Sequence, residues 1–232
     1  MSVKEVMQQP VGFTTVQIEA DPKKAVLITD ARIQARVSHL VRYLKPEIRA
    51  LSQPPLFLWL AKGARQMSVD LQFHLHVGGV VDSEFCPVKY TLYEGTQAVD
   101  VPKLIESEEF PFPNVNGRPV YIVDDILDTL ATASECMSNV AERGGTVVGG
   151  IFLAEKPESS PWRKRIRVAE WPEGVKKWSL FSVPDVWLEG HGMDTFEVGR
   201  ENPDVIVRWD MDKEKRKYYL KLQKALENEK LL

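Results

Sequence analysis

The sequence predicts an α/β fold with a central parallel sheet flanked by helices. Short apolar runs that are typical of buried strands alternate with longer segments whose apolar residues recur at helical spacing. One apolar run, residues 119–123, is followed by a helical segment and then by another apolar run, which is the strand-helix-strand order of a parallel sheet. The length of 232 residues suits one domain of this class.

The N-terminal half contains a long amphipathic helix. Apolar residues recur from Ile33 to Leu51 at a spacing of three and four, behind the candidate caps Thr29 and Asp30. Prolines 54 and 55 end this helix. The segments that follow are predicted to be a strand (56–60), a turn at Lys62 and Gly63, a second helix (64–75) and a strand rich in β-branched and aromatic residues (87–93).

Residues 94–118 predict a long irregular loop, because this stretch is polar and contains Pro102, Pro111 and Pro113. Loops of this length are usually functional or disordered.

The C-terminal half returns to alternating elements. The predicted elements are strand 119–123, helix 131–143 ending at the glycine pair 144–145, and strands 146–154, 178–184 and 204–209. Residues 211–232 predict a charged amphipathic helix with a narrow apolar stripe, which we expect to dock on the core or on a second subunit. Residues 1–26 are expected to form an N-terminal arm.

The composition excludes several classes of function. Thirty basic residues against 33 acidic ones leave a net charge of −3, which gives no overall attraction to nucleic acid or to anionic lipid. No apolar run reaches the roughly 18 residues of a membrane span, and the first residues lack the apolar region of a signal peptide. We therefore expect a cytoplasmic protein with no membrane or nucleic-acid partner, in which Cys86 and Cys136 are reduced thiols.

Three acids follow the predicted strand 119–123. In an open parallel sheet, ligands bind at the carboxyl ends of the strands, where Asp124, Asp125 and Asp128 are placed. Carboxylates this close repel one another unless a cation or a sugar diol compensates, so the pattern indicates a divalent metal with a polyol phosphate. The hydroxyl residues 129–134 then open a helix, whose N-terminus favours a phosphate. The acids alone also fit helix capping or the metal site of an unrelated hydrolase.

The stretch VYIVDDILDTLAT (120–132) resembles the phosphoribosyl-pyrophosphate (PRPP) loop of the type I phosphoribosyltransferases. Four further stretches are similar, in the same order, to segments of the hypoxanthine-guanine branch of that family. They are LITDARIQARVSHL (27–40), PLFLWLAKGA (55–64), IFLAEKP (151–157) and SVPDVWLEGHGMD (182–194). The resemblance implies the type I phosphoribosyltransferase fold over residues 27–210, with a small hood formed by the N-terminal arm and by residues after about 157.

The resemblance also implies an activity: transfer of the phosphoribosyl group of PRPP to a 6-oxopurine (hypoxanthine, guanine or xanthine), with Mg²⁺, in purine salvage. Asp124 and Asp125 match positions beside the ribose hydroxyls and the metal, and Asp194 matches a second metal ligand. Asp128 matches the general acid/base near N7 of the purine. The family implies the partners PRPP and a purine base, and a homodimer or homotetramer.

Other matched positions concern the phosphates and the base. Thr129, Leu130, Ala131 and Thr132 match the 5′-phosphate loop, and Lys62, Gly63 and Arg200 match the pyrophosphate contacts. Lys156, Trp187 and Leu188 match the base contacts, and Tyr93 matches a residue of the flexible loop. Lys156 as a donor to the 6-oxo group would favour 6-oxopurines over adenine. Taken singly, each of these residues also fits an ordinary core, turn or surface position.

Three residues depart from the family pattern. Leu130 stands where the family has glycine, Leu92 where it has serine before Tyr93, and His191 where it has an aromatic residue. These departures keep open a second interpretation, a regulator of the same fold that binds PRPP or purine nucleotides without catalysis. A metal-dependent phosphohydrolase is a third. His74 and His76 have no third metal ligand nearby and are expected to lie at an ordinary helix end.

Overall fold

The computed structural model describes residues 24–94, 97–156 and 170–211. The predicted arm (1–26) and C-terminal helix (211–232) fall almost entirely outside these residues, so the division of the chain into three parts stays a prediction. None of the helices described combines the length and the apolar character that crossing a bilayer requires.

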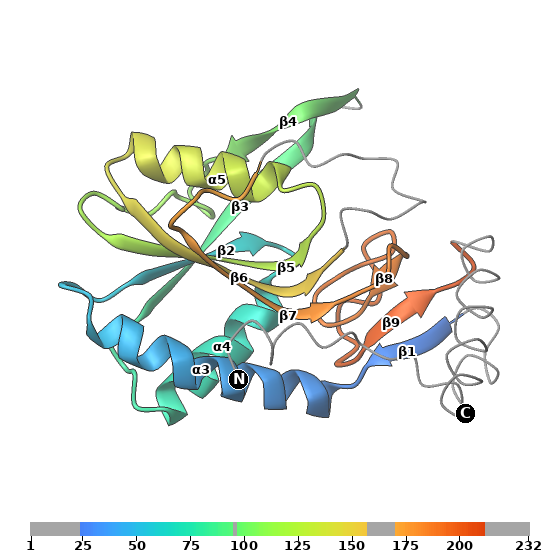
Figure 1. The fold of residues 1–232 in the computed structure, drawn as a ribbon. Helices are drawn as coiled ribbons and strands as arrows, with labels where there is room; N and C mark the ends of the chain where they lie inside the picture. Colours follow the sequence, from blue (N-terminus) through green and yellow to red (C-terminus); the bar gives the residue numbers. More distant parts are fainter. Residues whose placement is uncertain (1–23, 95–96, 157–169, 212–232) are drawn as a thin grey trace.

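The main sheet has six strands in the order β4-β3-β2-β5-β6-β7 (Figure 1). Strands β3, β2, β5, β6 and β7 are parallel, and β4 pairs with β3 in the antiparallel direction at the edge. The strands span β2 Leu56–Ala61, β3 Glu84–Glu94, β4 Gln97–Ile105, β5 Pro119–Leu127, β6 Thr146–Glu155 and β7 Lys176–Ser182. The predicted parallel sheet is confirmed.

Helices cover both faces of this sheet (Figure 1). Helices α3 (Asp30–Arg49) and α4 (Arg65–Val77) lie on one face, and α5 (Ala131–Glu142) lies on the other. The helical spacing predicted for α3 places its apolar residues inward, because Ile33, Val37, Leu40, Val41, Leu44 and Ile48 are buried. The histidines at positions 74 and 76 lie in the last turn of α4, as expected.

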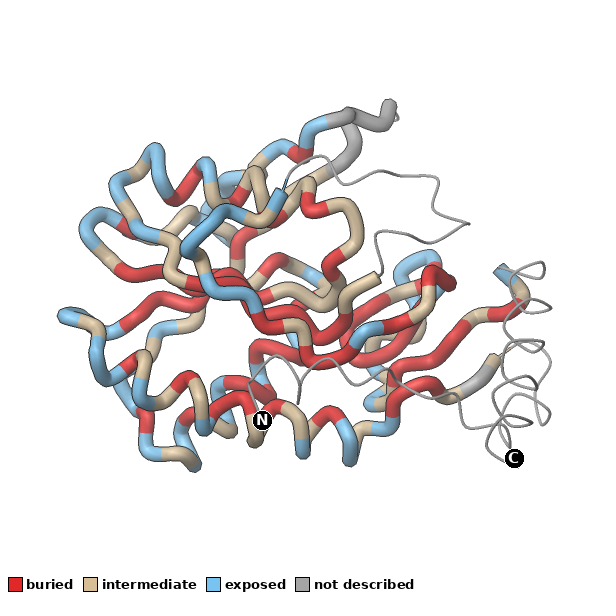
Figure 2. Tube along the Cα trace, in the orientation of Figure 1, coloured by how far each residue is buried: buried red, intermediate tan, exposed pale blue. Residues whose placement is uncertain are grey.

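A second, three-stranded sheet joins the two ends of the described chain. Its antiparallel strands β1 (Lys24–Ile28), β9 (Val205–Arg208) and β8 (Leu188–Glu189) lie in that order. Val205 and Val207 are fully buried in the same apolar core as α3 and α4, so this sheet is packed onto the main body (Figure 2). It is the small hood of the predicted fold. Neither β1 nor β8 was predicted as a strand.

Two sequence-based predictions about the strands were wrong. Residues 94–118 are not one irregular loop, because Gln97–Ile105 form β4. Pro102 did not prevent this, since β4 is an edge strand and has one side on which no hydrogen-bond donor is needed. Strand β5 continues to Leu127, four residues beyond its predicted end, so Asp124 and Asp125 belong to the strand itself.

Candidate active site

Several of the predicted site residues lie at the carboxyl end of the main sheet. Strand β2 ends at Ala61, directly before Lys62 and Gly63. Strand β5 carries Asp124 and Asp125 near its carboxyl end. Strand β6 ends at Glu155, directly before Lys156. Since these strands are parallel neighbours, their ends open on the same edge, which is where ligands bind in such sheets.

Asp124 and Asp125 form a crowded pair of carboxyl groups. The backbone N–H of Asp125 donates to Asp124 Oδ1 over 2.9 Å, and the N–H of Ile126 donates to Asp125 Oδ1 over 2.8 Å. Burial raises the pKa of Asp124, and repulsion from Asp125 raises it further. Burial also raises the pKa of Asp125, although hydrogen bonds and Arg200 partly offset this. The raised pKa values mean that the ionised form of each carboxyl group is disfavoured in its buried position, and a bound cation would favour it. Mg²⁺ fits this donor set, because it prefers carboxylate oxygen.

The turn after β2 packs directly against this pair. A Cβ atom on Gly63 would lie 2.1 Å from Asp125 Oδ2, so only glycine lets the turn approach this closely. A Cβ atom on Gly192, where φ is +100°, would in turn lie 2.0 Å from the carbonyl oxygen of Gly63. The peptide bond between Ala61 and Lys62 is cis. The turn is therefore held between β5 and the loop that follows β8.

That loop brings two more predicted residues to the same corner. Arg200 Nη2 lies 2.6 Å from Asp194 Oδ1, and Arg200 Nη1 donates to the carbonyl oxygen of Gly192 over 2.7 Å. Lys62 Nζ lies 3.0 Å from Glu197 Oε2, an exposed carboxylate on this loop. Ion pairs thus connect Lys62 through Glu197 to Arg200, whose charge opposes the rise in the pKa of Asp125 that burial causes. The roles that the resemblance implies for Lys62, Asp194 and Arg200 stay predictions. Glu197 was not predicted, since nothing in its local sequence pairs it with a lysine 135 residues away.

Lys156 and Asp128 lie side by side. Lys156 Nζ is 3.6 Å from Asp128 Oδ2 and 3.9 Å from Asp185 Oδ1, and the lysine side chain is only 16% exposed. The backbone N–H of Lys156 donates to the carbonyl oxygen of Leu127, which fixes the two strand ends together. Asp185 was not among the predicted site residues, although it lies in the matched stretch 182–194. The ammonium group can donate to an acceptor of a ligand, and the two carboxylates can accept from its donors.

Trp187 and Leu188 follow Asp185 on the same segment. The Trp187 side chain is 41% exposed, and its Nε1–H donates to Thr195 Oγ1 over 2.9 Å. An exposed ring that is fixed by a hydrogen bond can serve as a stacking surface. Leu188 is buried in β8, opposite Val207.

Leu130 adopts the backbone conformation of a glycine. Its φ of 68° lies in the left-handed region, directly before α5 begins at Ala131. Its side chain is 3% exposed and packs with Leu127, Ala133, Phe152 and Trp171. The leucine side chain therefore packs into this apolar cluster, and Ala131 and Thr132 at the start of α5 stay partly exposed. The N–H groups and the dipole of a helix start favour an anion. The Thr129 and Thr132 side chains are half-buried at this start.

The remaining predicted residue is Tyr93. It lies in β3, but its side chain, like that of Leu92, lies outside the described part of the structure. Its role in a flexible loop stays a prediction.

Comparisons with known proteins agree with this geometry. No protein-family model matches the chain. Among curated proteins, it is 27% identical to the hypoxanthine-guanine phosphoribosyltransferase of Bacillus subtilis over 182 residues, 78% of this chain and 91% of the relative. It is 25% identical to the hypoxanthine-guanine phosphoribosyltransferase of Mycobacterium tuberculosis over 191 residues, 81% of this chain and 87% of the relative.

The solved structures show the same fold. The chain matches a hypoxanthine phosphoribosyltransferase from Staphylococcus aureus with a TM-score of 0.66 and 19% identity, over 84% of this chain and 96% of the other. It matches the Trypanosoma cruzi hypoxanthine phosphoribosyltransferase in complex with the product IMP with a TM-score of 0.64 and 19% identity, over 79% and 92%.

Proposed function

We propose that this chain is a 6-oxopurine phosphoribosyltransferase of purine salvage. It has the fold of the hypoxanthine phosphoribosyltransferases and resembles their hypoxanthine-guanine branch over about four-fifths of its length. It transfers the phosphoribosyl group of PRPP to hypoxanthine, guanine or xanthine and releases pyrophosphate. The observation that carries this proposal is the meeting of the acid pair, the Lys62–Gly63 turn and the Lys156–Asp128 pair at one edge of a parallel sheet.

The pyrophosphate end of PRPP is assigned to the corner around Asp125. Lys62 and Arg200 offer positive charge there, and both are now paired with carboxylates that a phosphate group can replace. Asp124, Asp125 and Asp194 are the proposed holders of Mg²⁺. When bound, the ion would neutralise charge on the departing pyrophosphate. The 5′-phosphate is assigned to Thr129–Thr132 at the start of α5.

The base is assigned to the space between Trp187 and Lys156. The Lys156 ammonium group donates to the 6-oxo oxygen, and the exposed Trp187 ring stacks on the purine. Asp128, 3.6 Å from this ammonium group, is placed to accept or return a proton at N7 as the ring nitrogen attacks C1′. Adenine would present an amino group to the Lys156 ammonium group. Both groups are hydrogen-bond donors, so they would form no hydrogen bond with each other. The main-chain carbonyl of Leu188 is the proposed contact to the exocyclic edge.

The buried Leu130 side chain favours this enzyme over the regulator that shares its fold. The regulator interpretation depended in part on Leu130 obstructing the phosphate turn, and this side chain is buried in an apolar cluster instead. The departures at Leu92 and His191 remain as arguments for the regulator.

We also propose a cytoplasmic homo-oligomer, a dimer or a tetramer. The exposed face of α4 supports an interface, because Val69, Phe73 and Val77 lie at successive turns and are 52%, 61% and 67% exposed. Light scattering on the purified chain would give its mass in solution.

The activity is tested with purified protein, PRPP, Mg²⁺ and each of hypoxanthine, guanine, xanthine and adenine, by measuring nucleotide and pyrophosphate together. We expect equal amounts of both with at least one 6-oxopurine. Asp128→Asn should lower kcat by about 10²–10⁴-fold, the usual contribution of a general acid/base. Glu142→Gln, which removes an exposed carboxylate from α5, is the control and should leave the rate unchanged. No nucleotide with any of the four bases would contradict the proposal, as would release of inorganic phosphate alone.

A further inference from the structure

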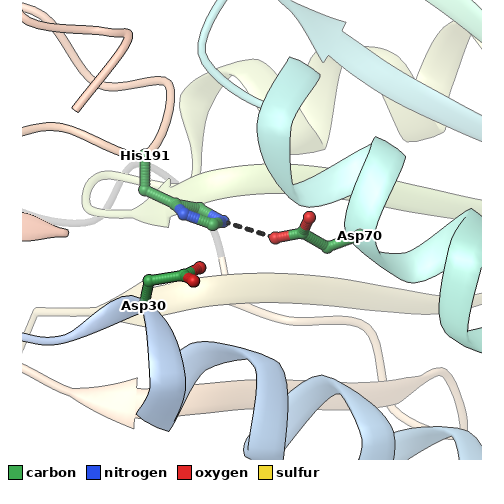
Figure 3. Close-up of side chains that lie close together, drawn as sticks. All are labelled: Asp30, Asp70 and His191. Atoms are coloured by element: carbon green, nitrogen blue, oxygen red, sulfur yellow. Dashed lines mark ion pairs between the residues drawn. The ribbon is translucent and has the colours of Figure 1, made fainter. Parts of the chain in front are cut away.

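A second group of polar side chains lies outside the candidate active site (Figure 3). Asp30 begins α3, Asp70 lies in α4, and His191 lies in the loop after β8. One ligand atom from each lies within 4.8 Å of the others, and His191 Nε2 is 3.1 Å from Asp70 Oδ2. His191 and Asp70 are buried, and Asp30 is partly exposed.

The hydrogen bonds of His191 determine which of its nitrogens carries the proton. Nδ1 lies 3.0 Å from the carbonyl oxygen of Pro203, which accepts and cannot donate, so Nδ1 carries a hydrogen. In the neutral ring, Nε2 then has a lone pair directed at the two carboxylates. Nε2 is fully buried, and no described residue makes a hydrogen bond to it. A lone pair and a carboxylate 3.1 Å apart repel one another unless a proton on Nε2 or a metal ion lies between them.

Side-chain amides donate hydrogen bonds to both carboxyl groups, including the Asp70 oxygen that faces His191. Gln34 Nε2 donates to Asp30 Oδ1 over 3.1 Å and to Asp70 Oδ2 over 2.9 Å, and Gln66 Nε2 donates to Asp70 Oδ1 over 3.2 Å. His74 Nε2 contacts Gln34 Oε1 over 2.9 Å, which fixes the orientation of that amide. The group therefore combines two hydrogen-bonded carboxyl groups with a buried ring nitrogen.

We propose that Asp30, Asp70 and His191 form a binding site for one first-row transition-metal dication, with zinc as the best match. Metal-bound histidines donate their other ring N–H to a carbonyl or carboxylate, and metal-bound carboxylates are themselves hydrogen-bonded. Both features are present here before any ion is added. An imidazole with two carboxylates is a ligand set for zinc, whereas Mg²⁺ prefers oxygen alone. Because Asp30 is partly exposed, a water molecule can reach the ion on that side and act as its fourth ligand.

The site has a structural role in this proposal. It joins α3 and α4 to the loop after β8, which also carries Gly192, Asp194 and Arg200. An ion bound to His191 holds the residue next to Gly192, and Gly192 packs on Gly63 of the active-site turn. The ion thus positions the loop without touching the substrates.

The test uses the full chain, stripped with a chelator and titrated with zinc chloride in the absence of PRPP and base, in a buffer that contains excess Mg²⁺. Calorimetry and elemental analysis should give one zinc per chain. At zinc concentrations about 100-fold above Kd, the Tm should rise by roughly 5 to 10 °C. His191→Gln and Asp30→Asn should lose the zinc and the Tm shift. His76→Gln, which removes an exposed histidine from the same helix as Asp70, should keep both.

Two results would overturn the proposal. One is a wild-type protein that binds no zinc and shows no Tm shift, in which case the group is an ion pair between a protonated His191 and Asp70. The other is a protein that still binds zinc after Asp30→Asn or His191→Gln but loses it after His76→Gln. Because Asp30 is partly exposed, its variant should fold even if the buried His191 cannot be replaced. Neither readout depends on the proposed transferase activity.

Discussion

Gly63 and Asp125 are in such close contact that no side chain fits between them. A Cβ atom on Gly63 would lie 2.1 Å from Asp125 Oδ2 and 2.7 Å from its Cγ. Two predicted active-site segments, from β2 and β5, are therefore positioned by a contact that only glycine allows.

Gly63→Ala should displace the Asp125 carboxylate and lower kcat/KM by about 10²-fold, the effect of misplacing a catalytic group by about 1 Å. Steady-state kinetics with PRPP as the varied substrate would measure this. Gly117→Ala is the contrasting variant, since Gly117 has open space around it but a φ of +70°. It should lower the free energy of unfolding by about 1 kcal/mol and leave kcat/KM unchanged. Equal kinetics for Gly63→Ala and wild type would contradict the prediction.

At position 130, glycine should give a more stable protein than alanine, which is the reverse of the usual order. Both Leu130→Ala and Leu130→Gly remove a buried side chain, which costs about 2–5 kcal/mol. Only glycine relieves the left-handed backbone at φ 68°, by about 1 kcal/mol. The glycine variant should therefore unfold at a higher urea concentration than the alanine variant. An alanine variant as stable as the glycine variant would show that the left-handed backbone has no cost.

The ion pair between Glu84 and Arg118 should stabilise the fold only above acidic pH. Arg118 Nη1 lies 2.7 Å from Glu84 Oε2, and the hydrogen bond from Arg118 lowers the pKa of Glu84 below 4.5. Its contribution is present above pH 4.5 and is lost as the pH falls through the lowered pKa. Glu84→Gln should lower the free energy of unfolding at pH 7 by at most about 1 kcal/mol, because Glu84 is half exposed. The difference should vanish in urea titrations well below the lowered pKa. A difference that grows in acid would be incompatible with this pairing.

Cys86 should react slowly with thiol reagents at pH 8. Burial and then the hydrogen bond to Glu84 raise the pKa of Cys86 to about 11, and burial raises the pKa of Cys136 to about 12. Only roughly 0.1% of Cys86 is then thiolate at pH 8, the reactive form. In a Cys136→Ala background, the labelling rate should rise about tenfold per pH unit up to about pH 11. The same chain in urea, where the thiol is exposed, is the control and should react at once.

The sequence predicts the elements that depend on local pattern. Helix α3 was placed correctly because its buried residues recur at helical spacing. Strands β2 and β6 and the first part of β5 were found because each is a nearly continuous apolar run, which is typical of a strand buried on both faces. Strand β4 was missed because it is an edge strand, in which proline and polar residues are tolerated. Strands β1 and β8 were missed because each is short and is stabilised by pairing with β9, far away in the sequence.

The roles of the site residues stay predictions, but their placement in the fold can be compared with the structure. Matched stretches identified the residues at the sheet edge, since each follows a recognisable strand. The pairing of Lys62 with Glu197 and the group around His191 are set by contacts across more than 100 residues. Contacts between residues this far apart leave no periodic pattern in the local sequence. The packing of Leu130 into the core was also not foreseen, because the sequence does not show on which side of the turn a side chain lies.

The pairing of β1 with β9 has a consequence for biosynthesis. A ribosome releases all six strands of the main sheet, the last ending at Ser182, before it releases Val205. The main sheet can therefore form on the nascent chain while β1, which ends at the buried Ile28, still lacks the strand with which it pairs in the finished protein. A chaperone that recognises apolar segments would meet this chain during that interval, at its beginning and not at its end.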